Sequence, residues 1–175
     1  SYSSAASDVY KRQSINNPHP QKGFLYNGAK NPDLDRFFLS PSHYALTLYA
    51  ALIETKRLND KSLKEFNKDG SVLDMIGSEH SPGHETNGGS FGQTISQAAG
   101  VAWARRRKKE KGLGWLFLSD GEFQEGQTWE ALMSMAFHKI SNLKIVVDVN
   151  GQQVDGKTCD LSLIHISEPT RPTPI

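Results

Sequence analysis

Two short apolar segments, each followed by a polar residue and a glycine, constrain the fold more than any other feature of the chain. The first spans residues 114–119 and precedes Asp120, and the second spans residues 143–149 and precedes Asn150. Both segments are rich in branched and aromatic residues, which predicts two buried strands. Apolar side chains between them recur at helical spacing, so the unit is a strand, a helix and a strand. Such a crossover makes the two strands parallel.

Asp120 and Asn150 are expected at one edge of this sheet, because the carboxyl ends of parallel strands meet where open α/β sheets bind ligands. A carboxylate and an amide oxygen suit a hard cation such as Mg²⁺, which usually completes its shell with phosphate oxygens and water. The alternative is that both residues only form turns, which Asp and Asn both favour. The expected fold class is α/β, a parallel sheet with flanking helices.

The composition is that of one soluble globular domain. The chain has 175 residues, of which 37% are apolar and 22% charged, and its formal net charge of +1 argues against a nucleic-acid partner. Six basic residues lie within 105–111, and we interpret them as solvated side chains that complement a helix dipole, with a polyanion-binding patch as the alternative. The single cysteine, Cys159, indicates a reducing, cytoplasmic compartment. No segment approaches the apolar length of a membrane span, so no membrane partner is expected.

Residues 78–93 form a second unusual segment, with four glycines, two histidines and no periodicity. A helix is predicted to begin at its end, near Thr94. A Gly-rich loop that leads into a helix N-terminus exposes backbone N–H groups to an anion, although most such loops are plain turns. Two further helices are predicted, one entered through Pro41 and capped by Ser42, and a short one opened by Ser62.

The two ends of the chain are predicted not to belong to the folded domain. Residues 3–13 and 161–171 resemble the translated products of the two opposite ends of a transposase-type sequencing adapter. We therefore expect non-native segments over 1–13 and 161–175, and a partial native domain over 14–160. The alternative is a natural polar N-terminus and a Pro-rich tail, and the uninterrupted gene sequence would decide between the two.

Three segments of the native part occur in a recognisable order. They are residues 35–43, residues 82–93, and residues 119–126 continuing to 148–151. They resemble three motifs of the transketolase family: Asp-Arg-Phe-x-Leu-Ser-x-Gly-His, Pro-Gly-Val-Glu-x-x-x-Gly-x-Leu-Gly-Gln, and the thiamine-diphosphate motif of Gly-Asp-Gly followed by Asn. The native part is similar in particular to the N-terminal subunit of split transketolases. The resemblance implies a truncated diphosphate-binding domain of the thiamine-diphosphate fold over residues 14–160.

The resemblance also implies a role for each matching residue. Asp120, the side chain of Asn150 and the backbone carbonyl of Gln152 would hold Mg²⁺, with diphosphate oxygens and a water completing the shell. Ser119 stands where the family has the first glycine of Gly-Asp-Gly, and places a larger residue beside the diphosphate. The residues implied to bind thiamine diphosphate are His43, Gly89, Ser90, Phe91, Ser119, Asp120, Gly121 and Asn150.

Two residues are implied to act in catalysis. His43 would lie near the diphosphate or the reacting centre, where an imidazole can carry protons. Glu125 would match a family glutamate at the dimer interface that links two active sites. The alternatives are a capping or core histidine, and an acid in the first turn of the crossover helix. His84 stands where the family often has an apolar residue, so we expect it to pack or to hydrogen-bond within its loop.

The activity that the resemblance implies is that of a thiamine-diphosphate and Mg²⁺-dependent transketolase. Such an enzyme moves a two-carbon ketol unit between sugar phosphates in pentose phosphate metabolism. This chain would supply only the diphosphate and metal half, and a homodimer or a C-terminal subunit carrying the pyrimidine-binding domain would complete the site. The fragment alone is expected to be inactive. A deoxyxylulose-phosphate synthase, a 2-oxo-acid dehydrogenase component and a non-catalytic subunit of the same fold are the alternatives.

Overall fold

Three parallel strands form the central sheet. The computed structural model describes residues 31–153 and 156–158, so the predicted adapter-like segments lie outside the described residues. The strands are β1 (Arg36–Leu39), β2 (Gly114–Ser119) and β3 (Leu143–Asp148), in that spatial order. Both pairings are parallel, which confirms the prediction for the two apolar segments, whereas the strand β1 was not predicted.

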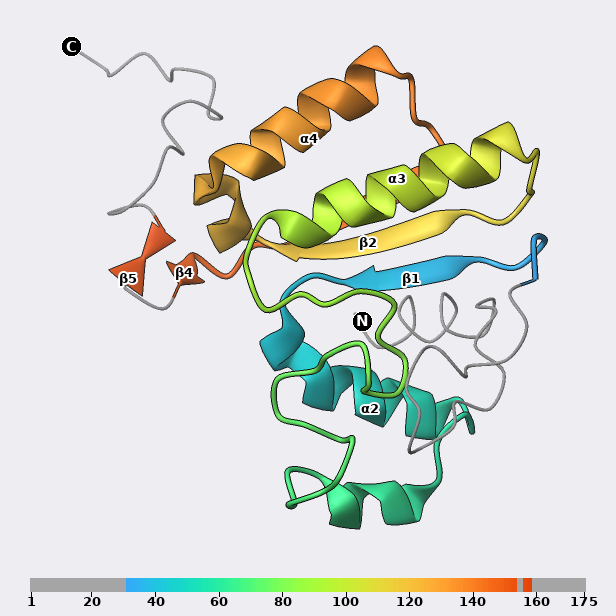
Figure 1. Ribbon diagram of the computed structural model, residues 1–175. Helices are drawn as coiled ribbons and strands as arrows, with labels where there is room; N and C mark the ends of the chain where they lie inside the picture. The colour runs from blue at the N-terminus through green and yellow to red at the C-terminus, as the bar shows by residue number, and fades with distance from the viewer. Residues whose placement is uncertain (1–30, 154–155, 159–175) are drawn as a thin grey trace.

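Helices cover both faces of this sheet, as Figure 1 shows: α3 and α4 lie on one side, and α2 and η3 on the other. The α-helices are α2 (Ala45–Glu54), α3 (Gln93–Arg107) and α4 (Gly126–Phe137). Three short 3-10 helices join them: η2 (Ser42–Tyr44), η3 (Asp60–Glu65) and η4 (Asp120–Gln124). A small antiparallel hairpin, β4 (Gln152–Gln153) and β5 (Gly156–Lys157), follows β3. None of the described helices is both long enough and apolar enough to cross a membrane.

Alternation along β1 explains why the core has two parts. Successive side chains of a strand point to opposite faces, so Phe37 and Leu39 pack against α2 while Phe38 packs against α3 and α4. The part below α2 consists of Phe37, Leu39, Ala45, Leu48, Tyr49, Leu52, Leu58 and Leu73. The part below α3 and α4 consists of Phe38, Ile95, Ala98, Ala102, Leu116, Leu118, Ala131, Met135 and Leu143. The sheet is therefore held between two helical layers.

The prediction that both apolar segments are buried is wrong for the second one. In β3 the side chain of Val146 is 41% exposed, and that of Val149, just past the strand, is 77% exposed. Among the described residues β3 pairs with β2 alone, so it is an edge strand. Ile145 and Val147 still pack against the α3 and α4 part of the core, which explains the apolar composition of the segment.

Both predicted helix caps are also wrong. Ser42 lies inside η2, and its hydroxyl donates to the carbonyl of Gly88 at 3.0 Å instead of capping. The short helix η3 begins at Asp60 and is capped by Asn59, whose Oδ1 accepts from the backbone N–H of Lys61 at 2.9 Å. In both cases the first turn is a tight 3-10 turn, which shifts the capping position away from the serine.

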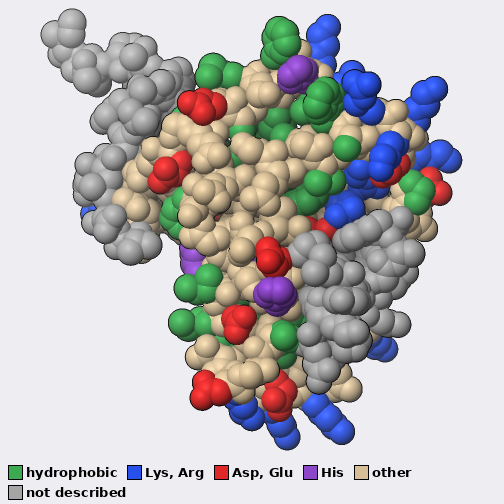
Figure 2. All heavy atoms as spheres, in the orientation of Figure 1, with side chains coloured by type: hydrophobic (Ala, Val, Ile, Leu, Met, Phe, Trp, Pro, Cys, Tyr) green, Lys and Arg blue, Asp and Glu red, His purple; other side chains and the backbone are tan. Residues whose placement is uncertain are grey.

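The interpretation of residues 105–111 as solvated cations fails for Arg105. This side chain is buried, and it donates to Glu110 at 2.6 Å and to the carbonyl of Leu34 at 2.8 Å. It ties the end of α3 to the segment before β1, because a guanidinium can serve several acceptors at once. Arg106, by contrast, is exposed and donates to the carbonyl of His138 at the end of α4 (3.0 Å). Figure 2 shows Lys and Arg side chains gathered on the side where α3 ends.

Candidate functional site

Asp120 and Asn150 lie together at the carboxyl ends of β2 and β3, as the strand order requires. Ser119 and Asp148 are register partners, and each candidate ligand follows within two residues. The backbone N–H of Gly151 donates to Asp120 Oδ2 at 2.9 Å. This bond joins the two strand ends directly and confirms that they share one edge of the sheet.

The two carboxylate oxygens of Asp120 differ, because one accepts hydrogen bonds and the other accepts none from the described residues. Asp120 is only 8% exposed, and its Oδ2 also accepts from the hydroxyl of Thr158 at 3.1 Å. Its Oδ1 is buried and has no hydrogen-bond partner among the described residues. A buried acceptor without a partner is costly, and a cation is the partner that a carboxylate oxygen accepts most favourably. The residues present therefore fit a hard divalent cation at this point.

Neighbouring polar groups fix the orientation of the Asn150 side chain. Its Nδ2 donates to Tyr44 Oη at 3.2 Å and to Asp148 Oδ2 at 3.4 Å, and Tyr44 Oη itself donates to Asp148 Oδ2 at 3.0 Å. Its Oδ1 accepts from the backbone N–H of Gln152 at 2.9 Å. Because both nitrogen protons face acceptors, the oxygen is the atom turned toward Gln152. Burial, followed by the hydrogen bond and charge of Asp148, raises the pKa of Tyr44, so this hydroxyl remains a neutral donor.

His43 and Phe91 come together although they are far apart in the sequence. The His43 side chain is exposed, and its ring lies 4.5 Å from the ring of Tyr44 and 6.0 Å from that of Phe91, measured between centroids. Tyr44 in turn contacts Asn150, so His43 adjoins the strand-end site through one intervening residue. The fold therefore places this histidine beside both the Gly-rich loop and the metal candidates.

The Gly-rich loop crosses the end of β1 at a point where only glycine fits. A Cβ added to Gly88 would lie 2.4 Å from the carbonyl oxygen of Ser40. At Gly89 the corresponding position has no atom within 4 Å, and the adjacent Ser90 is exposed. The loop is thus fixed on one side and open on the other, which suits a group that approaches its backbone closely.

The remaining predicted site residues lie around η4. Ser119 is buried at the end of β2, and Gly121 is buried beneath the hairpin, since an added Cβ would come 3.1 Å from Gln153 Cβ. Glu125 is exposed just before α4, and a Cβ on Gly92 would lie 3.0 Å from its own Cβ. Glu125 therefore sits between the starts of α3 and α4. The catalytic and cofactor roles assigned to these residues stay predictions.

Glu122 and Thr158 are site residues that sequence reasoning missed. Glu122 is completely buried and accepts hydrogen bonds from three segments, among them the backbone N–H of Ser119 at 2.9 Å. A signal for it existed, because Ser119 and Glu122 form the Ser-x-x-Glu pattern of a capping box. Thr158 had no such signal, since its contact with Asp120 depends on the folding back of the hairpin.

His84 packs in the interior, as its place in the loop led us to expect. It is 1% exposed, and neither ring nitrogen has a hydrogen-bond partner among the described residues. Gly77 lies so close that an added Cβ would be 2.0 Å from His84 Nε2. Burial lowers the pKa of His84 to about 4, so the ring is neutral near pH 7.

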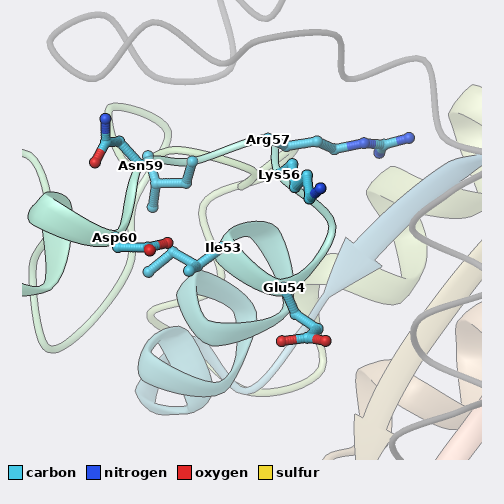
Figure 3. Close-up of a pocket in the computed structure, with 7 residues that line it drawn as sticks. Ile53, Glu54, Lys56, Arg57, Asn59 and Asp60 are labelled. Atoms are coloured by element: carbon cyan, nitrogen blue, oxygen red, sulfur yellow. The ribbon is translucent and has the colours of Figure 1, made fainter.

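A separate hollow of about 700 Å³ lies at the C-terminal end of α2 (Figure 3). Its lining side chains, several of which Figure 3 labels, all come from the short segment 53–60. His43 stands just before the other end of this helix, so the hollow is not part of the site at the strand ends.

Residues 2–165 match the family model described as the thiamine diphosphate binding domain of transketolase. The chain belongs to the transketolase family. This confirms the family that the three motifs indicated, and the parallel sheet with flanking helices confirms the expected fold class. The chain is 46% identical over 123 residues to the uncharacterized transketolase family protein y4mO of Sinorhizobium fredii, covering 70% of this chain and 44% of that protein.

Other members of the transketolase family agree with this assignment. Over 132 residues the chain is 33% identical to one subunit of the apulose-4-phosphate transketolase of Actinobacillus succinogenes, covering 75% of this chain and 48% of that protein. A transketolase mutant of Pichia stipitis, solved in complex with xylulose-5-phosphate, aligns with a TM-score of 0.75 at 25% identity, over 92% of this chain and 24% of that one. The chain thus spans less than half the length of these relatives.

Proposed function

We propose that this chain supplies the diphosphate and Mg²⁺ site of a thiamine-diphosphate-dependent transketolase that transfers a two-carbon ketol unit between sugar phosphates. The observation that carries the proposal is the buried Oδ1 of Asp120, which has no hydrogen-bond partner in the described part of the chain and lies at the same sheet edge as Asn150. In a turn that served no ligand, water would reach the carboxylate oxygens and hydrogen-bond to them. The membership of the transketolase family supports the choice of cofactor.

In this proposal each residue either binds the metal or the cofactor, or exchanges a proton with the substrate. Asp120 and the oxygen of Asn150 hold Mg²⁺, and the backbone carbonyl of Gln152 is the third protein ligand. The open backbone of Gly89 and Ser90 would receive the diphosphate, and Ser119 and Gly121 would contact it as well. When bound, thiamine diphosphate supplies the nucleophilic carbon and the electron sink for breaking a carbon–carbon bond of the donor ketose. His43, which is exposed and contacts the ring of Phe91, would exchange protons with the substrate in this proposal.

A partner completes the site in this proposal. The chain spans 44% and 48% of two transketolase relatives, the second of which is itself named as one subunit of its enzyme. We infer that the pyrimidine-binding part comes from a second copy of the full protein or from a separate C-terminal subunit. Glu125, exposed before α4, is the residue that we place at that interface. We expect no ketol transfer by the chain alone. We also expect the protein to act in the cytoplasm.

Calorimetry on the full-length parent protein tests the proposal. Thiamine diphosphate is titrated in the presence of Mg²⁺ into the wild type, into Asp120→Ala, and into Asp69→Ala as a control, because Asp69 is an exposed carboxylate. We expect the wild type and Asp69→Ala to bind equally, and Asp120→Ala to lose binding. Absence of binding by the wild type, or binding indifferent to Asp120→Ala, would favour a non-catalytic subunit that keeps the fold.

A further inference from the structure

We propose that Glu122 is a positioning residue. It fixes the position of the end of β2, which carries the metal-binding Asp120, relative to the Gly-rich loop. The inference rests on the proposed function, since it concerns the same cofactor site. Glu122 itself is 0% exposed, so it acts through its neighbours and does not touch the cofactor.

The carboxylate of Glu122 joins three segments that are distant in the sequence. Its Oε1 accepts from the hydroxyl of Ser40 and from the backbone N–H of Gly92 at 3.2 Å. Its Oε2 accepts from the backbone N–H of Ser119 at 2.9 Å. One side chain therefore connects the end of β1, the start of α3 and the end of β2.

Each of these partners is next to a group of the proposed site. Ser119 immediately precedes Asp120, and Gly92 immediately follows Phe91. Ser40 precedes the turn in which Ser42 holds the carbonyl of Gly88 at 3.0 Å. A shift of Glu122 would consequently move the metal-binding carboxylate relative to the loop that we expect to receive the diphosphate.

The start of α3 favours a carboxylate at this position. Gly92 is the N-cap of a helix of 15 residues, and its N–H points to Glu122. The positive end of the helix dipole stabilises a nearby negative charge. Gly92 also has a φ of +78°, and an added Cβ would lie 3.0 Å from Glu125 Cβ, so both backbone and packing require glycine there.

Helix capping alone does not account for these contacts. A capping glutamate bonds the backbone N–H of the residue three before it, and here that is Ser119. The bonds from Ser40 and Gly92 come from other elements. They therefore fix how those elements lie relative to one another, and they do not stabilise the short helix η4 itself. A glutamine would disturb that relation, because its amide nitrogen cannot accept from a backbone N–H.

The test compares Glu122→Gln with Ser40→Ala in the full-length parent and its partner. We expect Glu122→Gln to raise the KM for thiamine diphosphate, at saturating Mg²⁺, by about tenfold or more, and to leave kcat at saturating cofactor within about twofold. Ser40→Ala removes one donor and keeps both backbone bonds, so we expect a rise of about two- to fivefold. Glu65→Gln, at an exposed position outside the site, is the matched control and should leave the KM unchanged.

A loss of thermal stability with an unchanged KM for the cofactor would show a merely structural role and overturn the inference. So would a fall in kcat at an unchanged KM. If Glu122→Gln does not fold, Ser40→Ala decides alone: a raised KM supports the inference and an unchanged KM overturns it. Failure of the wild type to bind thiamine diphosphate would instead overturn the proposed function, and this inference with it.

Discussion

The two halves of the strand-end site differ in burial and in how their polar groups are satisfied. In the inner half, Glu122 is 0% and Asp120 8% exposed. Glu122 accepts hydrogen bonds from three separate segments, and Asp120 accepts from Gly151 and Thr158. In the outer half, His43 and Asn150 are exposed, and the hydrogen bonds join Tyr44 of η2 to Asp148 and Asn150 at the end of the edge strand β3. The inner half consists of Ser40, Gly92, Ser119, Asp120 and Glu122, and the outer half of His43, Tyr44, Asp148 and Asn150.

The difference follows from the place of each strand in the sheet. β2 is central and has neighbours on both sides, whereas β3 pairs only with β2 among the described residues. The end of β2 is enclosed from both sides, because Ser40 after β1 donates to Glu122 and Gly151 after β3 donates to Asp120. The end of β3 has only one neighbouring strand among the described residues. We conclude that the fold encloses the inner half, and that it leaves His43 and Asn150 of the outer half exposed at the surface.

The largest effect is expected from Asp120→Ala compared with Asn150→Ala. Removing the buried carboxylate should weaken Mg²⁺-dependent binding of thiamine diphosphate about a thousandfold, about 4 kcal/mol, because the cation loses its only charged protein partner in the proposed site. Asn150→Ala should cost about tenfold, since water can replace an exposed amide oxygen. Calorimetry on both variants measures the ratio, and equal losses would contradict the distinction between the halves.

A second effect concerns acid pH and the loop that leads into the site. An unfolded histidine binds its proton near pH 6.5, whereas His84 in the folded protein does so near pH 4. Between these values the unfolded state holds the extra proton, so stability falls as the pH is lowered from 6.5 to 4, by about 3 kcal/mol at most. Urea unfolding across this range should show the fall in the wild type and flatten it in His84→Phe. His80→Gln, at an exposed position, should retain the wild-type profile.

Two adjacent glycines separate packing from ligand contact. Gly88→Ala places a Cβ 2.4 Å from a backbone oxygen, and we expect a loss of about 2 kcal/mol in the free energy of unfolding. Gly89→Ala meets no atom within 4 Å, so its stability should change by about 0.5 kcal/mol or less. Its affinity for thiamine diphosphate should nevertheless fall, because the methyl group enters the space that we assign to the diphosphate. A Gly89→Ala protein of normal affinity would place the diphosphate elsewhere.

The smallest effect is expected in the outer half, from Tyr44→Phe. The change removes the acceptor at 3.2 Å from Asn150 Nδ2 and leaves Asp148 and the backbone N–H of Gln152 to orient the amide. We expect Mg²⁺ affinity to fall about fivefold, about 1 kcal/mol. Tyr49→Phe is the matched control: its hydroxyl donates to the carbonyl of Asp74 at 3.1 Å, outside the site, so it should affect stability and not Mg²⁺. A similar loss in both variants would remove the role given to Tyr44.

Local pattern predicted the elements and the shared edge, but not their surroundings. The two apolar segments were assigned to strands correctly, because short segments rich in branched and aromatic residues favour strands. That β3 is an edge strand was not predictable, since a short apolar segment has the same composition whether one or both of its faces are covered. Ser42 and Arg105 were misassigned for a related reason: their partners, Gly88 and Leu34, are distant in the sequence.

The sequence by itself determined the α/β class, the family, and the pairing of Asp120 with Asn150 at one edge, because spacing and strand direction are local properties. Only the tertiary structure decided which carboxylate oxygen is open, that Tyr44 orients Asn150, and that Glu122 joins three segments. These facts depend on contacts between residues up to 106 positions apart. Such contacts arise when helices and strands pack, and no spacing along the chain encodes them.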